Sequence, residues 1–294
     1  MVMIRVGGAT VTRIEETYAP AFQPSTFFPA WDPEVLSRHS AWMVPDHFDP
    51  STGCLKLSVH SWLIEVGGRR ILIDTCVGND KERPTRPMWH RMQTAYLERL
   101  SAAGVDPEDI DVVMCTHLHQ DHVGWNTHLV DGRWVPTFPN ARYIFSRADY
   151  EDSLARDADP KTAPANHGSF RDSIVPVVER GLADIIEPPF RFDEYLTIDP
   201  APGHTPGHIV VNLDSNGDRT LFPGDVIHHA IQLYRPEWNC FACADAEMAR
   251  ATRRRVLERC AESAALLAPT HFGAPFACHV EQHENAFRPR FIPA

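Results

Sequence analysis

The sequence predicts an α+β protein in which two β-sheets are flanked by helices. Strand-like runs come in pairs that are joined by glycine turns, as at Gly7-Gly8 and Gly67-Gly68, which is typical of hairpins. Helical periodicity falls between groups of strands rather than after every strand, which favours two covered sheets over a continuous βαβ winding. The 294 residues are enough for one large domain or two small ones.

The first half of the chain begins with strands. Alternating patterns predict strands over 3–15, 55–66, 70–74 and 111–115, and a helix is expected over 89–103, where Met92, Tyr96 and Leu100 share a face before Gly104. Between the first strands, residues 18–53 are rich in proline and aromatic residues, with one short helical stretch at 32–38. We predict a loop segment that either covers a pocket mouth or wraps the surface.

The second half returns to strands and ends in a hairpin. Strands are expected over 142–145, 194–198, 208–213, 220–222, 280–282 and 286–291. Helices are expected over 147–154, where Ser146 can act as the cap, over 169–180 with a kink at Pro176, and within 244–267.

Composition and charge narrow the class of protein. Hydrophobic residues make up 43% and charged residues 23%, which are ordinary globular values, and the net charge of −11 disfavours nucleic acid and anionic membranes as partners. No run of about 18 apolar residues is present and the amino terminus does not resemble a secretory signal, so we expect a cytoplasmic protein with no membrane partner.

The seven cysteines do not suggest a disulfide framework, because their number is odd and they are scattered. Cys240 and Cys243 form a C-x-x-C pair, which could be a redox or metal pair, but no second pair accompanies it. We therefore interpret these two cysteines as small buried residues. The 16 histidines are the more informative feature.

Four potential metal ligands fall within residues 117–122, directly after the predicted strand 111–115. The segment 116–124 reads T-H-L-H-Q-D-H-V-G. Side chains alternate at a strand end, so His117 and His119 should point to one side, and the following turn should bring Asp121 and His122 to a second point nearby. Imidazole and carboxylate ligands suit zinc, and imidazole also suits iron, copper and nickel.

One segment cannot complete two sites, so other parts of the chain must supply ligands. Three further candidates stand in turns beside predicted strands or apolar runs, namely His204, Asp225 and His271. Loops held on a rigid scaffold are where catalytic ligands usually lie.

The order H-x-H-x-D-H, followed at long range by His, Asp and His, resembles the metallo-β-lactamase superfamily of hydrolases over nearly the whole chain. The resemblance implies an αββα sandwich, a single domain over 1–294, and two metal ions at one edge of the sheets. Carried over residue by residue, it implies a first site of His117, His119 and His204, a second of Asp121, His122 and His271, and Asp225 as a bridge.

Within this superfamily the chain is similar to the N-acyl-homoserine-lactone lactonases, glyoxalase II and methyl parathion hydrolase, and its size and layout favour the lactonase and parathion-hydrolase branch. No cysteine lies near Asp225, unlike many lactamases with two zinc ions, and His119 replaces the glutamate of flavodiiron oxidoreductases. His228 stands three residues after Asp225, where lactonases have a tyrosine that contacts the substrate carbonyl, and a histidine can also donate a hydrogen bond.

The expected cofactors are two divalent ions, foremost Zn²⁺, with Fe, Co or Mn as alternatives. Two ions can share a water and lower its pKa from about 15.7 towards 7, and the resulting hydroxide would open a lactone or cleave a related small-molecule ester. Asp121 is the expected base and His228 the expected oxyanion donor, and Asp74 and His208 are expected to support the ligands.

Other functions remain compatible with the sequence. The same scaffold could host a phosphotriesterase or a β-lactamase-like hydrolase, and a non-catalytic metal-binding regulatory protein is the alternative of another class. Trp89, Trp125 and Tyr234 are candidates for lining a substrate cleft, although aromatic residues more often belong to a core. The oligomeric state is left open, with a homodimer among the expectations.

Overall fold

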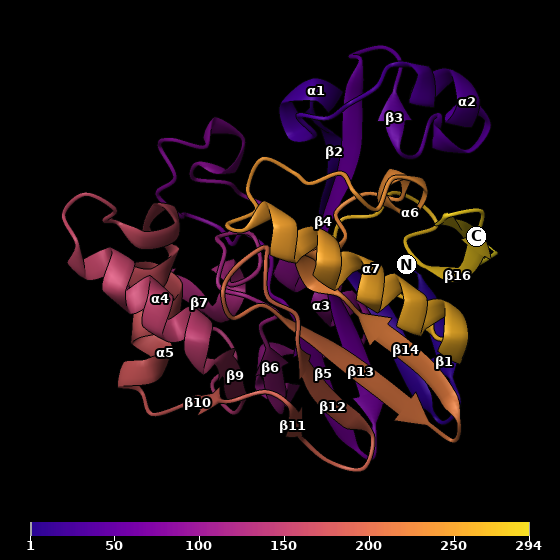
Figure 1. Ribbon diagram of the computed structural model, residues 1–294. Helices are drawn as coiled ribbons and strands as arrows, with labels where there is room; N and C mark the ends of the chain where they lie inside the picture. Colours follow the sequence, from indigo (N-terminus) through magenta and orange to yellow (C-terminus); the bar gives the residue numbers. More distant parts are fainter. Residues whose placement is uncertain (1, 294) are drawn as a thin grey trace.

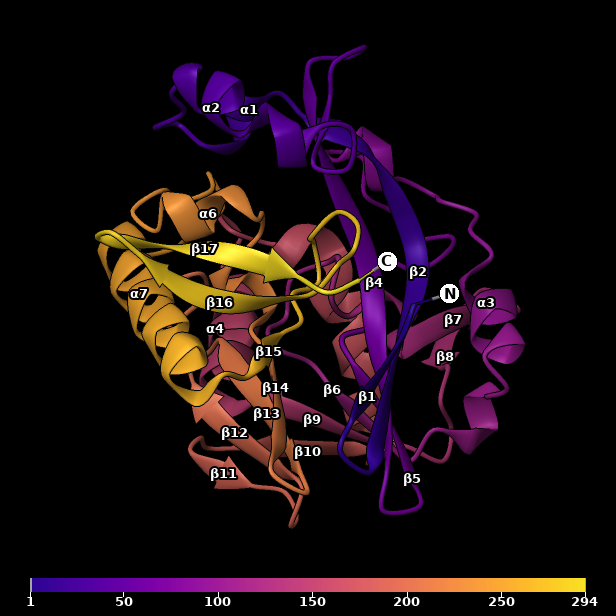
Figure 2. The ribbon, with the colours of Figure 1, turned by 90° about the vertical axis from the view of Figure 1, so that its right-hand side faces the viewer.

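The computed structural model describes residues 2–293 as two large sheets packed face to face with helices on both outer sides (Figures 1 and 2). Figure 2 shows the layers from the side: α7 covers the carboxyl-terminal sheet, and α3 lies on the far side of the amino-terminal sheet. The predicted αββα sandwich is confirmed.

The amino-terminal sheet has the order β1-β2-β4-β5-β6-β9-β10, with β3 paired to β4. Its β1-to-β5 half is antiparallel, and β5, β6, β9 and β10 run parallel. The strands are β1 (Met3–Val6), β2 (Ala9–Phe22), β3 (Phe48–Asp49), β4 (Cys54–Val66), β5 (Arg69–Ile73), β6 (Val112–Met114), β9 (Arg142–Ser146) and β10 (Ala183–Ile186).

The carboxyl-terminal sheet has the order β11-β12-β13-β14-β15-β16-β17, and only its β14–β15 pair is parallel. A separate hairpin is formed by β7 (Thr127–Val130) and β8 (Arg133–Pro136). The strands of this sheet are β11 (Phe190–Arg191), β12 (Leu196–Pro200), β13 (Ile209–Ser215), β14 (Asp218–Phe222), β15 (Leu266–Leu267), β16 (Cys278–His283) and β17 (Ala286–Phe291).

Seven α-helices and several shorter helical turns complete the part of the chain between residues 2 and 293. The helices are α1 (Pro24–Phe27), α2 (Glu34–Met43), α3 (Tyr96–Ala102), α4 (Arg147–Ala158), α5 (Val175–Glu179), α6 (Ile231–Tyr234) and α7 (Ala246–Ser263). The turns are Pro87–Trp89, Pro107–Asp109, Gly124–Asn126, Ala165–Gly168, Phe170–Ile174 and Gly224–Val226.

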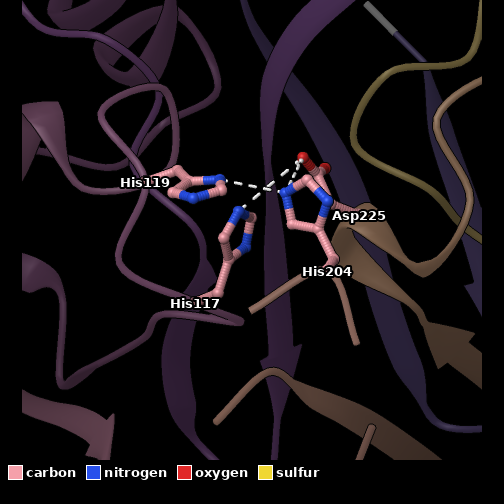
Figure 3. Close-up of side chains that lie close together, drawn as sticks. All are labelled: His117, His119, His204 and Asp225. Atoms are coloured by element: carbon pink, nitrogen blue, oxygen red, sulfur yellow. Dashed lines mark hydrogen bonds and ion pairs between the residues drawn. The ribbon is translucent and has the colours of Figure 1, made fainter. Parts of the chain in front are cut away.

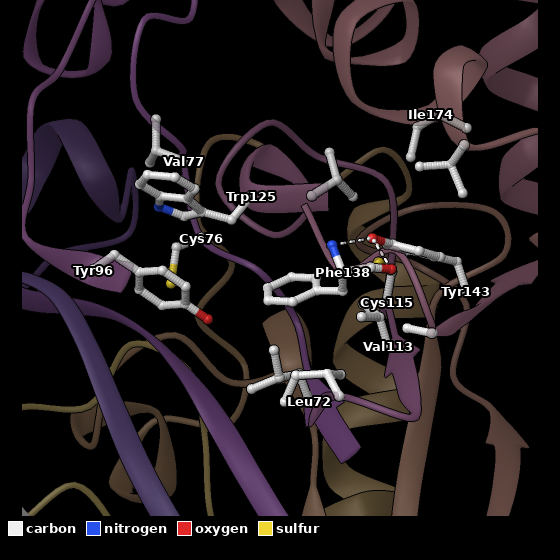
Figure 4. Close-up of a cluster of buried hydrophobic side chains, with 14 of the residues drawn as sticks. Leu72, Cys76, Val77, Tyr96, Val113, Cys115, Trp125, Phe138, Tyr143 and Ile174 are labelled. Carbon is white, nitrogen blue, oxygen red and sulfur yellow. Dashed lines mark hydrogen bonds between the residues drawn. The ribbon is translucent and has the colours of Figure 1, made fainter. Parts of the chain in front are cut away.

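Period-two alternation along the strands produces three stacked layers of buried side chains. On β4, Trp62 and Ile64 face the second sheet, whereas Leu63 faces the opposite layer under α3. Figure 4 shows that outer layer, in which Tyr96 of α3 stacks on Trp125 with ring centroids 5.4 Å apart. A third layer lies between α7 and the second sheet. The sheets are therefore fixed rigidly against each other.

The segment 18–53 is more regular than the predicted loop. The strand β2 continues to Phe22 because its second half pairs with β4, and the predicted stretch at 32–38 becomes α2. Its aromatic residues form a buried cluster with Ile231 and Trp238. The pairing of β2 with β4 joins residues far apart in the sequence, so the composition of the segment did not reveal it.

Two predicted helices were also wrong in extent. The helix expected over 89–103 begins only at Tyr96, since Arg91 has a positive φ of 50° that interrupts a helix. Over 169–180, a π-turn at Phe170–Ile174 precedes α5, so Pro176 starts a helix rather than kinking one. The hairpin of β7 and β8 was missed although Asp131-Gly132 is a turn signal.

No helix within residues 2–293 is long and apolar enough to cross a membrane.

Candidate metal centre

Four separate loops meet at one edge of the two sheets. The segment that carries His117 to His122 follows β6 of the first sheet, and His204, Asp225 and His271 follow β12, β14 and β15 of the second. The parallel pairing of β14 and β15 places the ends of these two strands side by side. All seven predicted ligands therefore come together.

The first group of donors consists of His117, His119, His204 and Asp225, whose ligand atoms lie within 4.8 Å of one another (Figure 3). Nε2 of His204 lies 2.9 Å from Nδ1 of His119 and 3.2 Å from Oδ2 of Asp225. Nε2 of His117 is 3.7 Å from the same carboxylate oxygen. Three imidazoles and one carboxylate oxygen thus converge on a single point.

The second group consists of Asp121, His122 and His271. The two imidazoles face each other with their Nε2 atoms 3.3 Å apart, and Oδ2 of Asp121 lies 3.6 Å from Nε2 of His271. The other oxygen of Asp225, Oδ1, lies 3.2 Å from His122 and 3.1 Å from His271. Asp225 therefore presents one oxygen to each group, as a bridging ligand would.

The far nitrogens of the ligand rings are held by the protein. Nδ1 of His122 donates to Asp74 at 2.8 Å, and Nδ1 of His271 donates to the carbonyl of Ser58 at 2.8 Å. Asp74 also accepts the backbone N–H of Thr116 at 2.7 Å, next to His117. Such contacts fix the tautomer and leave the other nitrogen free for a cation.

Two glycines allow the ligand loops to approach their neighbours. A Cβ on Gly224 would lie 2.5 Å from Oγ1 of Thr116, and one on Gly203 would lie 2.3 Å from the backbone nitrogen of Ala249 in α7. Both residues also have positive φ values of 49° and 132°. Larger side chains at either position would displace Asp225 or His204.

The turn after His204 is anchored by a buried carboxyl group. Asp149 of α4 accepts hydrogen bonds from Oγ1 of Thr205 at 2.9 Å and from the backbone N–H of Gly207 at 2.6 Å. Its burial raises the pKa of this carboxyl to about 6. Further along the turn, Nε2 of His208 accepts the backbone N–H of Asp225 at 3.0 Å, so this histidine supports the bridge.

The charges at the centre suit divalent cations. Burial and neighbouring imidazoles hold the pKa values of His117 and His119 well below their usual range, so both rings are neutral near pH 7. Burial alone would raise the pKa of Asp225, but His122 and the other imidazoles outweigh it and hold the pKa well below its usual range. The same carboxylate raises the pKa values of His122, His204 and His271 despite their burial, so a bound cation would take the place of their protons. Buried imidazoles around a carboxylate are a nitrogen and oxygen donor set for zinc or a related ion.

Two buried polar atoms without hydrogen-bond partners also indicate that the centre binds cations. Nε2 of His117 and Oδ1 of Asp225 are buried and lack a hydrogen-bond partner within residues 2–293. Buried polar atoms are rarely left without a partner, and here both face the points where the donors converge. The residues therefore fit a two-cation centre.

A cavity of roughly 620 Å³ opens above the centre, and Asp121, Asp225 and His228 lie on its wall. Three stretches of the chain supply aromatic residues to its lining: Phe22 and Phe27 come from 18–53, Trp89 from 79–90, and Phe241 from 226–243. The segment 18–53 thus borders the pocket. The stretch 156–167 also contributes, which the sequence analysis missed.

His228 lies inside the site. Its Nε2 is 3.1 Å from Oδ2 of Asp225 and 3.3 Å from Sγ of Cys240, and burial lowers its pKa. Two of the three aromatic candidates do not line the cavity: Trp125 belongs to the layer under α3, and Tyr234 packs on Trp42.

The interpretation of the C-x-x-C pair as two small buried residues was incomplete. Cys240 and Cys243 pack against Nδ1 of His204, at 4.0 and 3.7 Å. A hydrogen bond with Cys240 and the nearby His204 lower the pKa of Cys243 to about 4, despite burial. The C-x-x-C spacing itself was the available signal.

Comparison with known proteins gives a consistent result. Residues 55–271 match the family model described as the Metallo-beta-lactamase superfamily. The N-acyl homoserine lactonase AttM of Azorhizobium caulinodans is 30% identical over 168 residues, which are 49% of this chain and 56% of that protein. The chain spans about half the length of the curated relatives it matches first.

Two solved structures share the fold over nearly their full length. Hydrolase AbOPH of the beta lactamase superfamily has a TM-score of 0.81 at 24% identity, with 99% of this chain and 97% of that chain covered. AidC, described as a dizinc quorum-quenching lactonase in complex with a product, has a TM-score of 0.76 at 19% identity, with 100% and 97% covered.

Proposed function

The chain belongs to the metallo-β-lactamase superfamily, and we propose that it is a dinuclear metal-dependent hydrolase that opens a lactone or cleaves a related ester. The observation that carries the proposal is the position of Asp225, with one carboxylate oxygen 3.2 Å from His204 and the other 3.1 Å from His271. The naming of AttM and AidC as lactonases supports the substrate class.

In this proposal His117, His119 and His204 would hold the first ion, Asp121, His122 and His271 would hold the second, and Asp225 would contact both. When bound, two divalent ions supply a nucleophilic hydroxide at neutral pH and polarise the substrate carbonyl. Zn²⁺ suits this nitrogen and oxygen donor set best.

The protein's own side chains supply proton transfer and orientation. Asp121 lines the cavity beside the second group, so its carboxylate can accept a proton from the attacked substrate and pass it to the leaving alkoxide. His228 is neutral near pH 7 because burial lowers its pKa, so one ring N–H can donate to the developing oxyanion.

The cavity favours a small amphipathic substrate. Phe22, Phe27 and Phe241 give part of its lining an apolar character, which suits an acyl chain. Arg86 and Arg156 also line the cavity and offer hydrogen-bond donors to a carbonyl or an amide. An N-acylated lactone has both features.

The test is a hydrolysis panel of lactones, thioesters, phosphotriesters and β-lactams, run with the zinc-loaded protein and with Asp225→Ala. We expect lactones to react fastest, and Asp225→Ala to lose bound metal and turnover together, by more than the roughly 10–100-fold typical of an outer-shell change. Fastest turnover of a phosphotriester or a β-lactam would replace the lactonase assignment. Inactivity on every class would favour a regulatory metal-binding role.

A further inference from the structure

A second cluster of metal-ligating side chains lies behind His204. Cys240 and Cys243 belong to the loop between α6 and α7, and their sulfur atoms are 3.8 Å apart. Nδ1 of His204, the nitrogen that faces away from the proposed two-cation centre, lies 3.7 Å from Sγ of Cys243 and 4.0 Å from Sγ of Cys240.

The sulfur–sulfur separation matches that of two ligands of one metal ion, and the two sulfur–nitrogen separations are slightly longer than in a filled site. Two thiolates at about 2.3 Å from a tetrahedral ion lie about 3.8 Å apart, and a thiolate and an imidazole nitrogen lie about 3.5 Å apart. A disulfide would need the two sulfur atoms at about 2.0 Å, and the seven cysteines of this chain are free. The donors thus surround a point that one ion can occupy.

Backbone hydrogen bonds hold the cysteine loop against the loop of His204. The N–H of Ala244 donates to the carbonyl of His204 at 3.0 Å, and the N–H of Asp245 donates to that of Gly203 at 2.9 Å. Asp245 also caps α7 through the N–H groups of Glu247 and Met248. The sulfur atoms and the imidazole are therefore fixed relative to one another before any ion arrives.

The loop segment before Cys240 is fixed by a buried arginine side chain. Arg253 of α7 is fully buried and donates to the carbonyls of Pro236 and Trp238 at 2.8 and 2.7 Å, and to Oδ1 of Asn239 at 3.0 Å. These hydrogen bonds fix the backbone on the amino-terminal side of Cys240.

The fourth coordination position is accessible. Cys240 lines the cavity, and Nε2 of His228 lies 3.3 Å from its sulfur atom. An ion could approach Cys240 from the cavity, and either His228 or a water could complete its shell. Two sulfur donors and a nitrogen donor select soft ions over Mg²⁺ or Ca²⁺.

We propose that Cys240, Cys243 and Nδ1 of His204 form a further metal site, distinct from the two-cation centre, for a soft thiophilic ion such as Zn²⁺, Cd²⁺ or Cu⁺. The site depends on the proposed function only through His204, whose ring would then lie between two metal sites as an imidazolate, with its remaining ring proton released to solvent when the second ion binds.

The experiment is a Cd²⁺ titration of the zinc-loaded protein, followed by the ultraviolet thiolate-to-cadmium charge-transfer band. The two-cation centre offers only nitrogen and oxygen donors, so this band reports on sulfur ligands alone. We expect saturation at one Cd²⁺ per chain in the wild type. We expect the band to be lost in Cys240→Ser and in Cys243→Ser.

The matched control is Cys54→Ser, because Cys54 is the other partly exposed thiol and its sulfur is hydrogen-bonded with Gln23 and Thr52. This control should keep the full band. A wild-type protein without the band, or a band that survives in the double variant Cys240→Ser/Cys243→Ser, would overturn the site. So would a mass lower by two hydrogens after reductant is removed, since it would show a disulfide pair instead.

Failure here and failure of the proposed function can be told apart. Zinc content and lactone turnover measure the two-cation centre, whereas the sulfur band measures the cysteine pair. A normal band in a protein that hydrolyses no lactone supports the further site and refutes the lactonase proposal. Lactone turnover without the band supports the lactonase proposal and refutes the further site. Circular dichroism of each serine variant verifies that it is folded.

Discussion

At the scale of single residues, the centre depends on carboxylates that each contact two separate parts of the chain. Asp225 faces both donor groups, and its backbone N–H is held by His208. Asp74 is fully buried and accepts hydrogen bonds from both Thr116 and His122. Each of these carboxylates joins parts of the chain far apart in sequence, so changing one should alter several ligands together.

His228 is predicted to act on turnover and not on metal content. In His228→Ala the seven proposed ligands remain, but the oxyanion loses a donor, which is worth about 3 kcal/mol or roughly a hundredfold in kcat. Metal analysis and steady-state kinetics on the best lactone would show this split. His279→Ala, on the distant strand β16, is the control. Unchanged kinetics in His228→Ala would remove this residue from the reaction.

Asp74 is predicted to act on metal affinity. Asp74→Asn keeps the shape of the side chain but removes the charge that holds Nδ1 of His122, so zinc affinity should fall by about 10–100-fold. Competition with a chromophoric chelator measures this change. Asp111→Asn, an exposed carboxylate that accepts the N–H of Arg70, is the matched control. Equal affinities in the two variants would contradict the role of Asp74.

At the scale of elements, the sequence could predict features that depend on a short continuous segment. His117 to His122 lie within six residues, and Asp225 and His271 come two or three residues after apolar runs, so these side chains could be singled out from the sequence, and the resemblance to the superfamily supplied their grouping. The approach of Cys243 to His204 was not, because 39 residues separate them and the contact depends on how two loops fold together. The extension of β2 to Phe22 likewise depends on pairing with β4.

The anchoring of the His204 turn by α4 predicts a pH effect on stability. Burial raises the pKa of Asp149 to about 6 in the folded protein, above its unfolded value of about 3.9. The folded state binds the proton more tightly, so this group lowers the free energy of unfolding as pH rises from about 4 to about 6. The loss is complete above that range and absent below it.

Asp149→Asn removes this titration while keeping the shape of the side chain. Relative to the wild type, its free energy of unfolding should rise by on the order of 2–3 kcal/mol between about pH 4 and pH 7. Urea unfolding at several pH values measures the difference. Asp152→Asn, on the more exposed side of the same helix, is the control. A pH-independent difference for Asp149→Asn would contradict the assignment.

At the scale of the whole molecule, the proposed ions would lie at the edge where loops from the two sheets meet. The loop after β6 belongs to the first sheet, and the loops after β12, β14 and β15 belong to the second. Bound cations would therefore link the sheets at one edge, in addition to the apolar layer between them. Binding to the folded state alone stabilises a protein by mass action.

Metal removal should accordingly lower the thermal stability. At a free ion concentration of about 1,000 times Kd, one ion contributes roughly 4 kcal/mol. We expect chelation to reduce Tm in the wild type and to leave Asp225→Ala nearly unchanged, as measured by calorimetry with and without a chelator. A wild-type Tm that does not move after verified removal of metal would contradict a linking role for the ions.

The central claim is that two neighbouring cations share Asp225, and anomalous diffraction at the zinc edge tests it most directly. Crystals of the zinc-loaded protein should show two peaks about 3.5–4 Å apart, one beside His117 and one beside His122, whether or not an ion also occupies the site at Cys240. A single peak, or peaks that leave either oxygen of Asp225 without an ion, would contradict the claim.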